Sequence, residues 1–311
     1  MRVTSNTFPS SLRDQITRLT QRQASLQNQA ATGQLIALPE DNPTAMRRVL
    51  DMQGESTKVG QFLDNVSRHQ ELATATYSGL KALRSIVDRA AEIATLAGGI
   101  QPGRDLQLYA TEVNGLVEQA LQVANSQNRG DYLFAGTQTN QAAFAATRDA
   151  NGNITSIAYQ GNAQVAESEV SGDLLMSSQI PGANTGGTGV RGLMSDSRSG
   201  ADLFGHLLAL RDRLQAGDAT AVTEDSLREL RTDEEHLLVH IGANGAVQAR
   251  LETTEKLLQD RSDSIEGLVS KEADADLAET LVRLSEIQTA YQAALQSGGS
   301  ILNRSLLDYL R

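Results

Sequence analysis

Both ends of the chain carry residues at alternating intervals of four and three, the spacing of helices that pack along one another. Near the start, Leu12, Leu19 and Leu26 lie seven residues apart, and Ile16 begins a second, weaker row. Near the end, a longer row consists of Leu277, Leu281, Leu284, Gln288, Tyr291, Leu295, Gly298 and Leu302. This pattern predicts long helices whose two ends pair with each other or with neighbouring chains.

Charge favours the same pairing. Up to residue 36 the chain has a single acid, Asp14, and four arginines, Arg2, Arg13, Arg18 and Arg22. From Asn244 onward acids outnumber bases. Opposite charges on matched helices favour association between them.

Composition excludes several kinds of site. The 311 residues include no cysteine and no tryptophan, so the sequence offers no disulfide, no thiol nucleophile and no Cys-ligated metal. Only 4% of residues are aromatic, so a core must come mainly from Leu, Val, Ile and Ala. The net charge of −11 argues against nucleic acid as a partner, because phosphate binding needs a basic surface.

The order of the expected elements follows from capping residues, breakers and periodicity. Gly33 suits a helix end, and Asn42 before Pro43 suits the start of the next helix. We expect helices over about 11–33, 59–97, 105–128 and 202–217, a long helical region from about 221, and a bend or restart at Asp276. Between them, strands at 154–159 and 165–170, an Asn-Gly hairpin turn and a flexible loop at 181–192 form a β-rich block.

No motif in the chain indicates catalysis. His236 and His240 are four residues apart, but the glutamate of the HExxH pattern is missing, and we expect a solvated or partly packed helix face with no metal. Residues 187–192 match G-x-G-x-x-G without the βαβ unit of a dinucleotide site, which predicts a surface loop. Arg129-Gly130-Asp131 lies at an expected helix end and is interpreted as a turn. We expect no enzyme and no cofactor.

No run approaches the roughly 20 apolar residues of a membrane span, and the first residues do not have the pattern of a secretory signal. They superficially resemble a mitochondrial transit peptide. An organellar protein is disfavoured, because the C-terminal row needs the N-terminal helix to be retained.

Three segments carry a resemblance to the flagellin superfamily, and within it to the flagellar hook-associated proteins of the hook–filament junction. They are the N-terminal run MRVTSNTF…LRDQITRLTQRQASLQNQAATGQLIALPEDNPTAMRRVL, the segment DYLFAGT at 131–137, and the C-terminus AETLVRLSEIQTAYQAALQSGGSILNRSLLDYLR. The helical ends resemble flagellins generally, whereas DYLFAGT and the ending SLLDYLR favour the junction type. Arg304 departs from the aliphatic or small residue expected there.

The resemblance implies a mainly α fold with a small β-rich insertion, in which the N- and C-terminal segments form a long antiparallel helical bundle. It implies three parts: a terminal, axial part (1–41 with 276–311), a helical middle part (42–140 with 199–275) and a variable outer β domain (141–198). It also implies a structural subunit of the flagellum, exported without a cleaved signal and located outside the cell. We expect assembly to depend on Leu12, Ile16, Leu19, Leu26, Leu281, Leu284, Leu295 and Leu302.

The partners implied are further copies in a ring, the preceding hook-associated junction protein, flagellin and an export chaperone, with no nucleic acid and no membrane insertion. Two alternatives stay open. One is a filament-forming, minor flagellin. The other is a soluble helical signalling or chaperone-like protein whose ends form a self-contained bundle.

Overall fold

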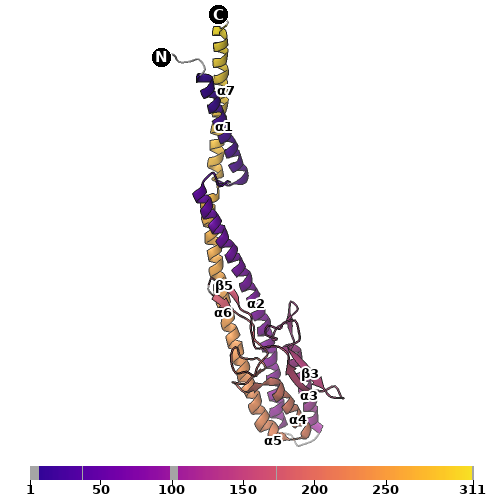
Figure 1. The fold of residues 1–311 in the computed structure, drawn as a ribbon. Helices are drawn as coiled ribbons and strands as arrows, with labels where there is room; N and C mark the ends of the chain where they lie inside the picture. Colours follow the sequence, from indigo (N-terminus) through magenta and orange to yellow (C-terminus); the bar gives the residue numbers. More distant parts are fainter. Residues whose placement is uncertain (1–6, 37, 99–103, 173, 310–311) are drawn as a thin grey trace. The chain divides into compact units, whose positions relative to one another are not determined.

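The computed structural model describes residues 7–36, 38–98, 104–172 and 174–309, and for residues 7–9, 104 and 301–309 it describes the backbone only. The fold is mainly α with a small β-rich insertion, as the sequence predicts (Figure 1). The helices are α1 (Thr7–Thr32), α2 (Pro43–Ala97), α3 (Arg104–Ala124), α4 (Leu203–Ala216), α5 (Ala219–Ala221), the π-helical turn η1 (Val222–Ser226), α6 (Leu227–Ala273) and α7 (Leu277–Tyr309).

The strands are short and form small separate sheets. Three antiparallel pairs consist of β1 (Gln127–Asn128) with β2 (Asp131–Tyr132), β3 (Phe144–Arg148) with β4 (Ile154–Tyr159), and β5 (Ser168–Ser171) with β6 (Leu174–Met176). In the fourth sheet β8 (Ser195–Asp196) lies between β7 (Ala183–Asn184) and β9 (Ala201–Asp202).

The chain divides into two compact units. Unit 1 comprises Met1–Val59 and Asp260–Arg311, and unit 2 comprises Gly60–Gln259. Within unit 1, α1 packs against α7, and Figure 1 shows both chain ends at the same end of this antiparallel pair. Within unit 2, α3 packs against α4, and the β3–β4 hairpin contacts both helices. The main hydrophobic core lies entirely within unit 2.

Local signals place several helix ends correctly. Gly33 ends α1 in the left-handed conformation with φ 72°, and the Asn42 side chain accepts a hydrogen bond from the Ala45 amide at the start of α2. Asp276 likewise accepts from the amides of Ala278 and Glu279, so the expected restart there is confirmed. Each contact lies within a few residues, which is why the sequence alone could predict it.

One open question is answered and one expectation is wrong. α2 begins at Pro43, as its cap predicts, and continues through the periodic segment at 59–97, and α6 continues through Gly242 and Gly245 without a break. Burial on the rest of unit 2 outweighs the cost of about 1 kcal/mol per glycine in a helix. The segment expected to be a flexible loop is buried over residues 181–184, where β7 pairs with β8.

The DYLFAGT segment at 131–137 is a structural junction within unit 2. Phe134 is fully buried, and Gly136 adopts φ 67° with its Cα against the 162–164 segment. A Cβ at position 136 would lie 2.1 Å from the carbonyl oxygen of Asn162. The Asn162 side chain in turn accepts a hydrogen bond from the Thr137 amide at 3.1 Å. The segment therefore ties the end of α3 to the β insertion.

Candidate assembly interface

The α1–α7 pair of unit 1 has a continuous seam. On α1 the half-buried apolar residues include Leu12, Ile16, Leu19 and Leu26. On α7 the corresponding face consists of Thr280, Leu284, Ile287, Tyr291, Ala294 and Gly298, at steps of four and three. Gly298 is buried against Leu12, and a Cβ there would lie 2.7 Å from a Leu12 methyl carbon. The two helices therefore approach most closely where α7 has no side chain.

The structure brings together five of the eight residues expected to carry assembly. These are Leu12, Ile16, Leu19, Leu26 and Leu284, all half-buried in unit 1. Leu281 is 56% exposed and Leu295 is 48% exposed, so both lie outside the seam. The side chain of Leu302, like that of Arg304, lies outside the described residues.

The sequence missed Ile287 and Ala294, which face inward. Two rows of residues on α7 have alternating intervals of four and three, one beginning at Leu277 and the other at Thr280. The first row contains more leucines, so the sequence favours it. In the single chain the second row faces α1. Leu284, Tyr291 and Gly298 belong to both rows, so the spacing alone does not separate them.

Unit 1 has very little core of its own. Among the described residues, its buried apolar side chains are Ile36, Ala45, Val49, Val59 and Ile265. Half of the 16 large apolar residues that are exposed in the described chain belong to this unit, namely Leu35, Leu38, Leu50, Leu268, Leu277, Leu281, Val282 and Leu295. A concentration of exposed apolar side chains on a unit with so small a core is typical of an interaction surface.

A groove of about 470 Å³ lies between α1 and α7. Its apolar lining is Leu26, Leu35 and Ile287, and its polar lining is Arg22, Ser25, Gln29, Arg283 and Glu286. Apolar walls with charges at the margin match the usual anatomy of a protein–protein contact.

The segment that connects α1 to α2 is hydrogen-bonded to the segment that connects α6 to α7. The Leu35 amide donates to the carbonyl of Ala273 at 2.6 Å, and the Ala275 amide donates to the carbonyl of Gly33 at 2.8 Å. Arg48 on α2 also forms an ion pair with Glu272 on α6 at 2.7 Å. The point where α1 gives way to α2 is therefore joined to the point where α6 gives way to α7.

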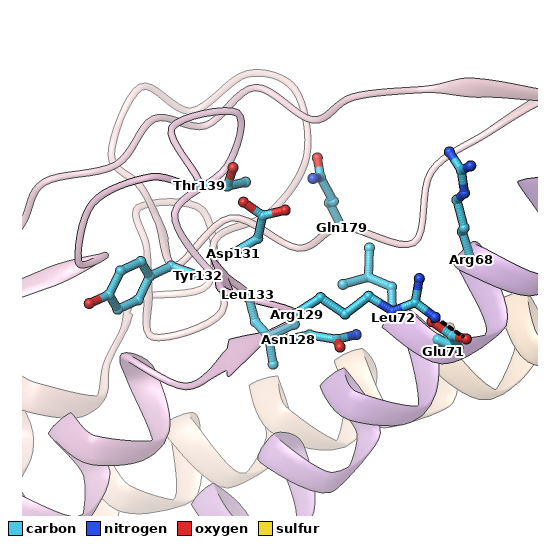
Figure 2. A pocket seen from close by; sticks show the side chains of 10 residues that line it. All are labelled: Arg68, Glu71, Leu72, Asn128, Arg129, Asp131, Tyr132, Leu133, Thr139 and Gln179. Carbon is cyan, nitrogen blue, oxygen red and sulfur yellow. Dashed lines mark hydrogen bonds and ion pairs between the residues drawn. The ribbon is translucent and has the colours of Figure 1, made fainter.

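Arg129-Gly130-Asp131 forms the tip of the β1–β2 hairpin in unit 2. Arg129 and Gly130 have φ values of 54° and 94°, the positive angles of a two-residue hairpin turn. Figure 2 shows the Arg129 side chain reaching α2, where it forms an ion pair with Glu71 at 2.6 Å. A small pocket of about 190 Å³ adjoins the turn, with Arg68 and Gln179 at its margin. The ion pair holds the turn against α2.

The glycine-rich stretch at 187–192 has no phosphate-binding context. It follows β7 and precedes β8, with no helix N-terminus at its end. The Asn184 side chain donates to the carbonyls of Thr188 and Val190, each at 2.6 Å, and these bonds close the exposed part of the loop. None of the described helices is long and apolar enough to cross a membrane.

These features define a class of protein: a helical subunit whose N- and C-terminal segments pair, with a β insertion between its central helices. Residues 3–139 match the family model of the bacterial flagellin N-terminal helical region. The N-terminal part of the chain is therefore similar to the N-terminal helical region of bacterial flagellins. No curated protein matches the chain closely enough to count as a relative.

Within that class, the fold is that of the flagellar hook-associated proteins. A flagellar hook-associated protein from Vibrio parahaemolyticus has 17% identity and a TM-score of 0.64, with 75% of this chain and 100% of that chain covered. FlgL from Bacillus cereus has 15% identity and a TM-score of 0.56, with coverage of 71% and 99%. The flagellar junction protein FlgL from Legionella pneumophila has 16% identity and a TM-score of 0.54, with coverage of 73% and 99%.

Proposed function

We propose that this protein is a structural subunit of the bacterial flagellum, at the hook–filament junction on which flagellin polymerises. The observation that carries the proposal is the exposed apolar surface of unit 1. Among the residues of unit 1 whose side chains the structure describes, five apolar residues are buried and eight large apolar residues are exposed. Such a unit gains its packing from neighbouring subunits, as expected of a component of a helical assembly.

The fold supports the junction role over other roles for the same helices. A solved relative with 99% of its length covered is a flagellar junction protein. No catalytic role is proposed, because neither the interface nor the polar groups described above resemble a reaction centre.

In this proposal residues 1–41 and 276–311 form the inner, axial part of the subunit. Residues 42–140 and 199–275 form the middle part, and residues 141–198 face outward. Leu12, Ile16, Leu19, Leu26 and Leu284 hold α1 on α7. Leu281 and Leu295, and with them Leu302, contact neighbouring subunits.

The partners in the proposal are further copies of the chain in a ring, the preceding hook-associated protein on one side and flagellin on the other. The subunit is exported without a cleaved signal, with a flagellar export chaperone as a cytoplasmic partner, and is located outside the cell. A chain that must pass through an export channel unfolded is well served by the absence of cysteine, because no cross-link can form.

Deletion of the gene tests the role directly. We expect cells with hooks but no filaments, and flagellin released into the medium as monomer. Electron microscopy of the cells and an immunoblot of the medium measure both. Hooks that still carry normal filaments would exclude an essential junction role and favour a dispensable minor flagellin.

Substitution of the exposed leucines tests the proposed surface. We expect the double variant Leu281→Gln/Leu295→Gln to leave the unfolding temperature of the monomer nearly unchanged, because both side chains are about half exposed. If each leucine contact with a neighbouring subunit loses about 1 kcal/mol, the two losses together lower the association constant of one subunit with the assembly roughly thirty-fold. The double variant is therefore expected not to restore filaments or swimming to the deletion strain.

Leu175→Gln is the matched control, because Leu175 is 60% exposed on β6 in the proposed outer part. It should restore swimming fully. Equal swimming with the double variant and with this control, at equal secreted levels, would refute the assignment of Leu281 and Leu295 to the assembly surface.

A further inference from the structure

Two histidines of α6 converge on one backbone carbonyl of the β insertion. His236 Nε2 lies 2.7 Å and His240 Nε2 lies 3.2 Å from the carbonyl oxygen of Gly192, and the two nitrogens are 3.2 Å apart. The side chains are nearly inaccessible, with exposures of 4% and 6%. The expectation of a solvated or partly packed helix face is therefore wrong. Gly192 is buried together with Leu193 and Met194, and its carbonyl contacts both rings.

The arrangement suits neutral imidazoles. If each ring carries its proton on Nε2, both can donate to the two lone pairs of the Gly192 carbonyl. A second proton on either ring would go to Nδ1, and His236 Nδ1 is buried without a hydrogen-bond partner among the described residues. A charged ring would also lie beside the other ring. Both effects oppose protonation in the closed arrangement.

A metal ion does not account for the pair. No group of three potential side-chain ligands occurs in the described part of the chain. His236 Nδ1 also has no partner that could orient the ring as a ligand.

The charged groups around the pair do not offset a new positive charge. On the insertion, Arg191 opposes protonation of His240, and Asp196 favours it only weakly. The Asp196 carboxylate already accepts from the Arg198 guanidinium and from the Gly192 amide. On the helices, Glu234 of α6 lies 4.0 Å from Arg84 of α2, and Glu167 lies at the margin of the neighbouring cavity.

That cavity, of about 410 Å³, gives solvent a route toward His240. Its apolar lining includes Val165, Ile180, Val190, Val239 and Val247, and His240 contributes to its wall. Burial, together with the neighbouring His236, lowers the pKa of His240 to about 4. A lowered histidine pKa means that the closed arrangement is favoured above pH 6.5 and loses stability as the pH falls from 6.5 toward 4.

A third histidine, His206 of α4, responds in the opposite direction. His206 Nδ1 lies 2.8 Å from Asp233 Oδ2, and the Asp233 carboxylate also accepts from the amide of Asp202 at 3.1 Å. Burial opposes the charged ring, but the hydrogen bond and charge of Asp233 outweigh it and raise the pKa of His206. A raised histidine pKa favours this contact below pH 6.5, and the contact weakens as the pH rises through the raised value.

We infer that His236 and His240 form an acid-sensitive latch that holds the segment around Gly192 against α6, while the His206–Asp233 contact keeps the following β9–α4 junction attached. Mild acid therefore opens the insertion locally and leaves unit 2 folded. This inference is independent of the proposed flagellar role.

Hydrogen exchange of the full chain between pH 7 and pH 5, corrected for intrinsic exchange rates, measures the opening. The reporters are the amides of Leu193 and Met194, which are hydrogen-bonded to Pro181 and Gly182 across this segment. With a histidine pKa of 6.5 in the open form and about 4 in the closed form, the protection of these amides should fall about twenty-fold between pH 7 and pH 5. Stronger acid is avoided, because burial raises the pKa of Asp233 as well.

The variant His236→Gln/His240→Gln keeps amide donors for the Gly192 carbonyl and removes both ionisable groups. In this variant the protection of the Leu193 and Met194 amides should therefore change less than about three-fold between pH 7 and pH 5. His69→Gln is the control, since His69 is buried elsewhere in unit 2, with its ring nitrogen 2.6 Å from Ser168 Oγ. This control variant should keep the response of about twenty-fold at Leu193 and Met194.

Unchanged protection of the wild-type protein between pH 7 and pH 5 would overturn the inference, as would an equal loss in the double variant. If the double variant does not fold, NMR titration of the wild-type rings decides instead. Titration of His240 above pH 6 in the folded protein would contradict the latch.

Discussion

Replacement of Gly192 by alanine is expected to lower the free energy of unfolding of unit 2 by about 3–5 kcal/mol. A Cβ at this position would lie 2.3 Å from both the Asn184 amide nitrogen and the Ser195 carbonyl oxygen, and 2.5 Å from the carbonyl carbon of Ala183. All three atoms belong to the backbone of the β7–β8 pair, so no side-chain rotation can relieve the overlap. Urea or thermal unfolding followed by circular dichroism measures the loss.

The cost is large because Gly192 makes contacts on both sides. Its amide donates to Asp196 at 3.0 Å, and its carbonyl accepts from the two histidines of α6. A shift of the backbone that makes room for a methyl group must weaken bonds to buried partners, which costs about 1–3 kcal/mol for each group left unsatisfied.

Gly186→Ala is the control for this prediction. Gly186 lies in the same loop, its φ is not positive, and the atom nearest to an added Cβ is Asn184 Oδ1 at 3.6 Å. Gly186→Ala should change the free energy of unfolding by no more than about 0.5 kcal/mol. Equal stability of the two variants would show that the close backbone contacts at Gly192 do not constrain the fold.

The second substitution with a large expected effect is Phe134→Ala. It should lower the free energy of unfolding of unit 2 by about 3–5 kcal/mol. Phe134 is fully buried, and its ring lies against α2 at Gly79, where a Cβ would be 3.2 Å from Phe134 Cζ. Truncation leaves a cavity that the surrounding helices can only partly close. Denaturant unfolding measures the change, and a reduced slope would indicate that the insertion has loosened as well.

Phe134→Leu separates the ring from the backbone role of the same residue. The Phe134 carbonyl accepts from the Gly182 amide at 2.7 Å and from the Tyr159 hydroxyl at 3.0 Å, and neither bond needs the ring. We expect Phe134→Leu to lower the free energy of unfolding by only about 1 kcal/mol, because leucine keeps most of the buried apolar volume. If Phe134→Ala were as stable as Phe134→Leu, the ring would not be the anchor of the DYLFAGT segment.

Part of the fold was predictable because its causes are local. The end of α1 at Gly33, the cap of α2 at Asn42 and the start of α7 after Asp276 each depend on a residue and its next few neighbours. The strand at 154–159 was predicted at its observed bounds, because Gly and Asn residues bound it on both sides. The pairing of α1 with α7 followed from two rows of apolar residues with the same spacing.

The candidate interface was predicted less completely. Leu12, Ile16, Leu19 and Leu26 were assigned to α1 from a single row, and all four lie on its half-buried face. For α7, two rows fit the same spacing and share Leu284, Tyr291 and Gly298, and the burial of Thr280, Ile287 and Ala294 in the structure shows which row faces α1. The exposure of Leu281 and Leu295 is a consequence of that choice.

The sequence by itself determined that this chain forms long helices with paired ends, because periodicity and capping act within a few residues of the same segment. The tertiary structure alone decided that α6 continues through Gly242 and Gly245, that residues 181–184 are buried, and that His236 and His240 meet the carbonyl of Gly192. Each of these outcomes depends on contacts between segments far apart in the chain. Such contacts leave no periodic trace in the sequence, because a buried polar pair or a buried glycine is defined by what packs against it.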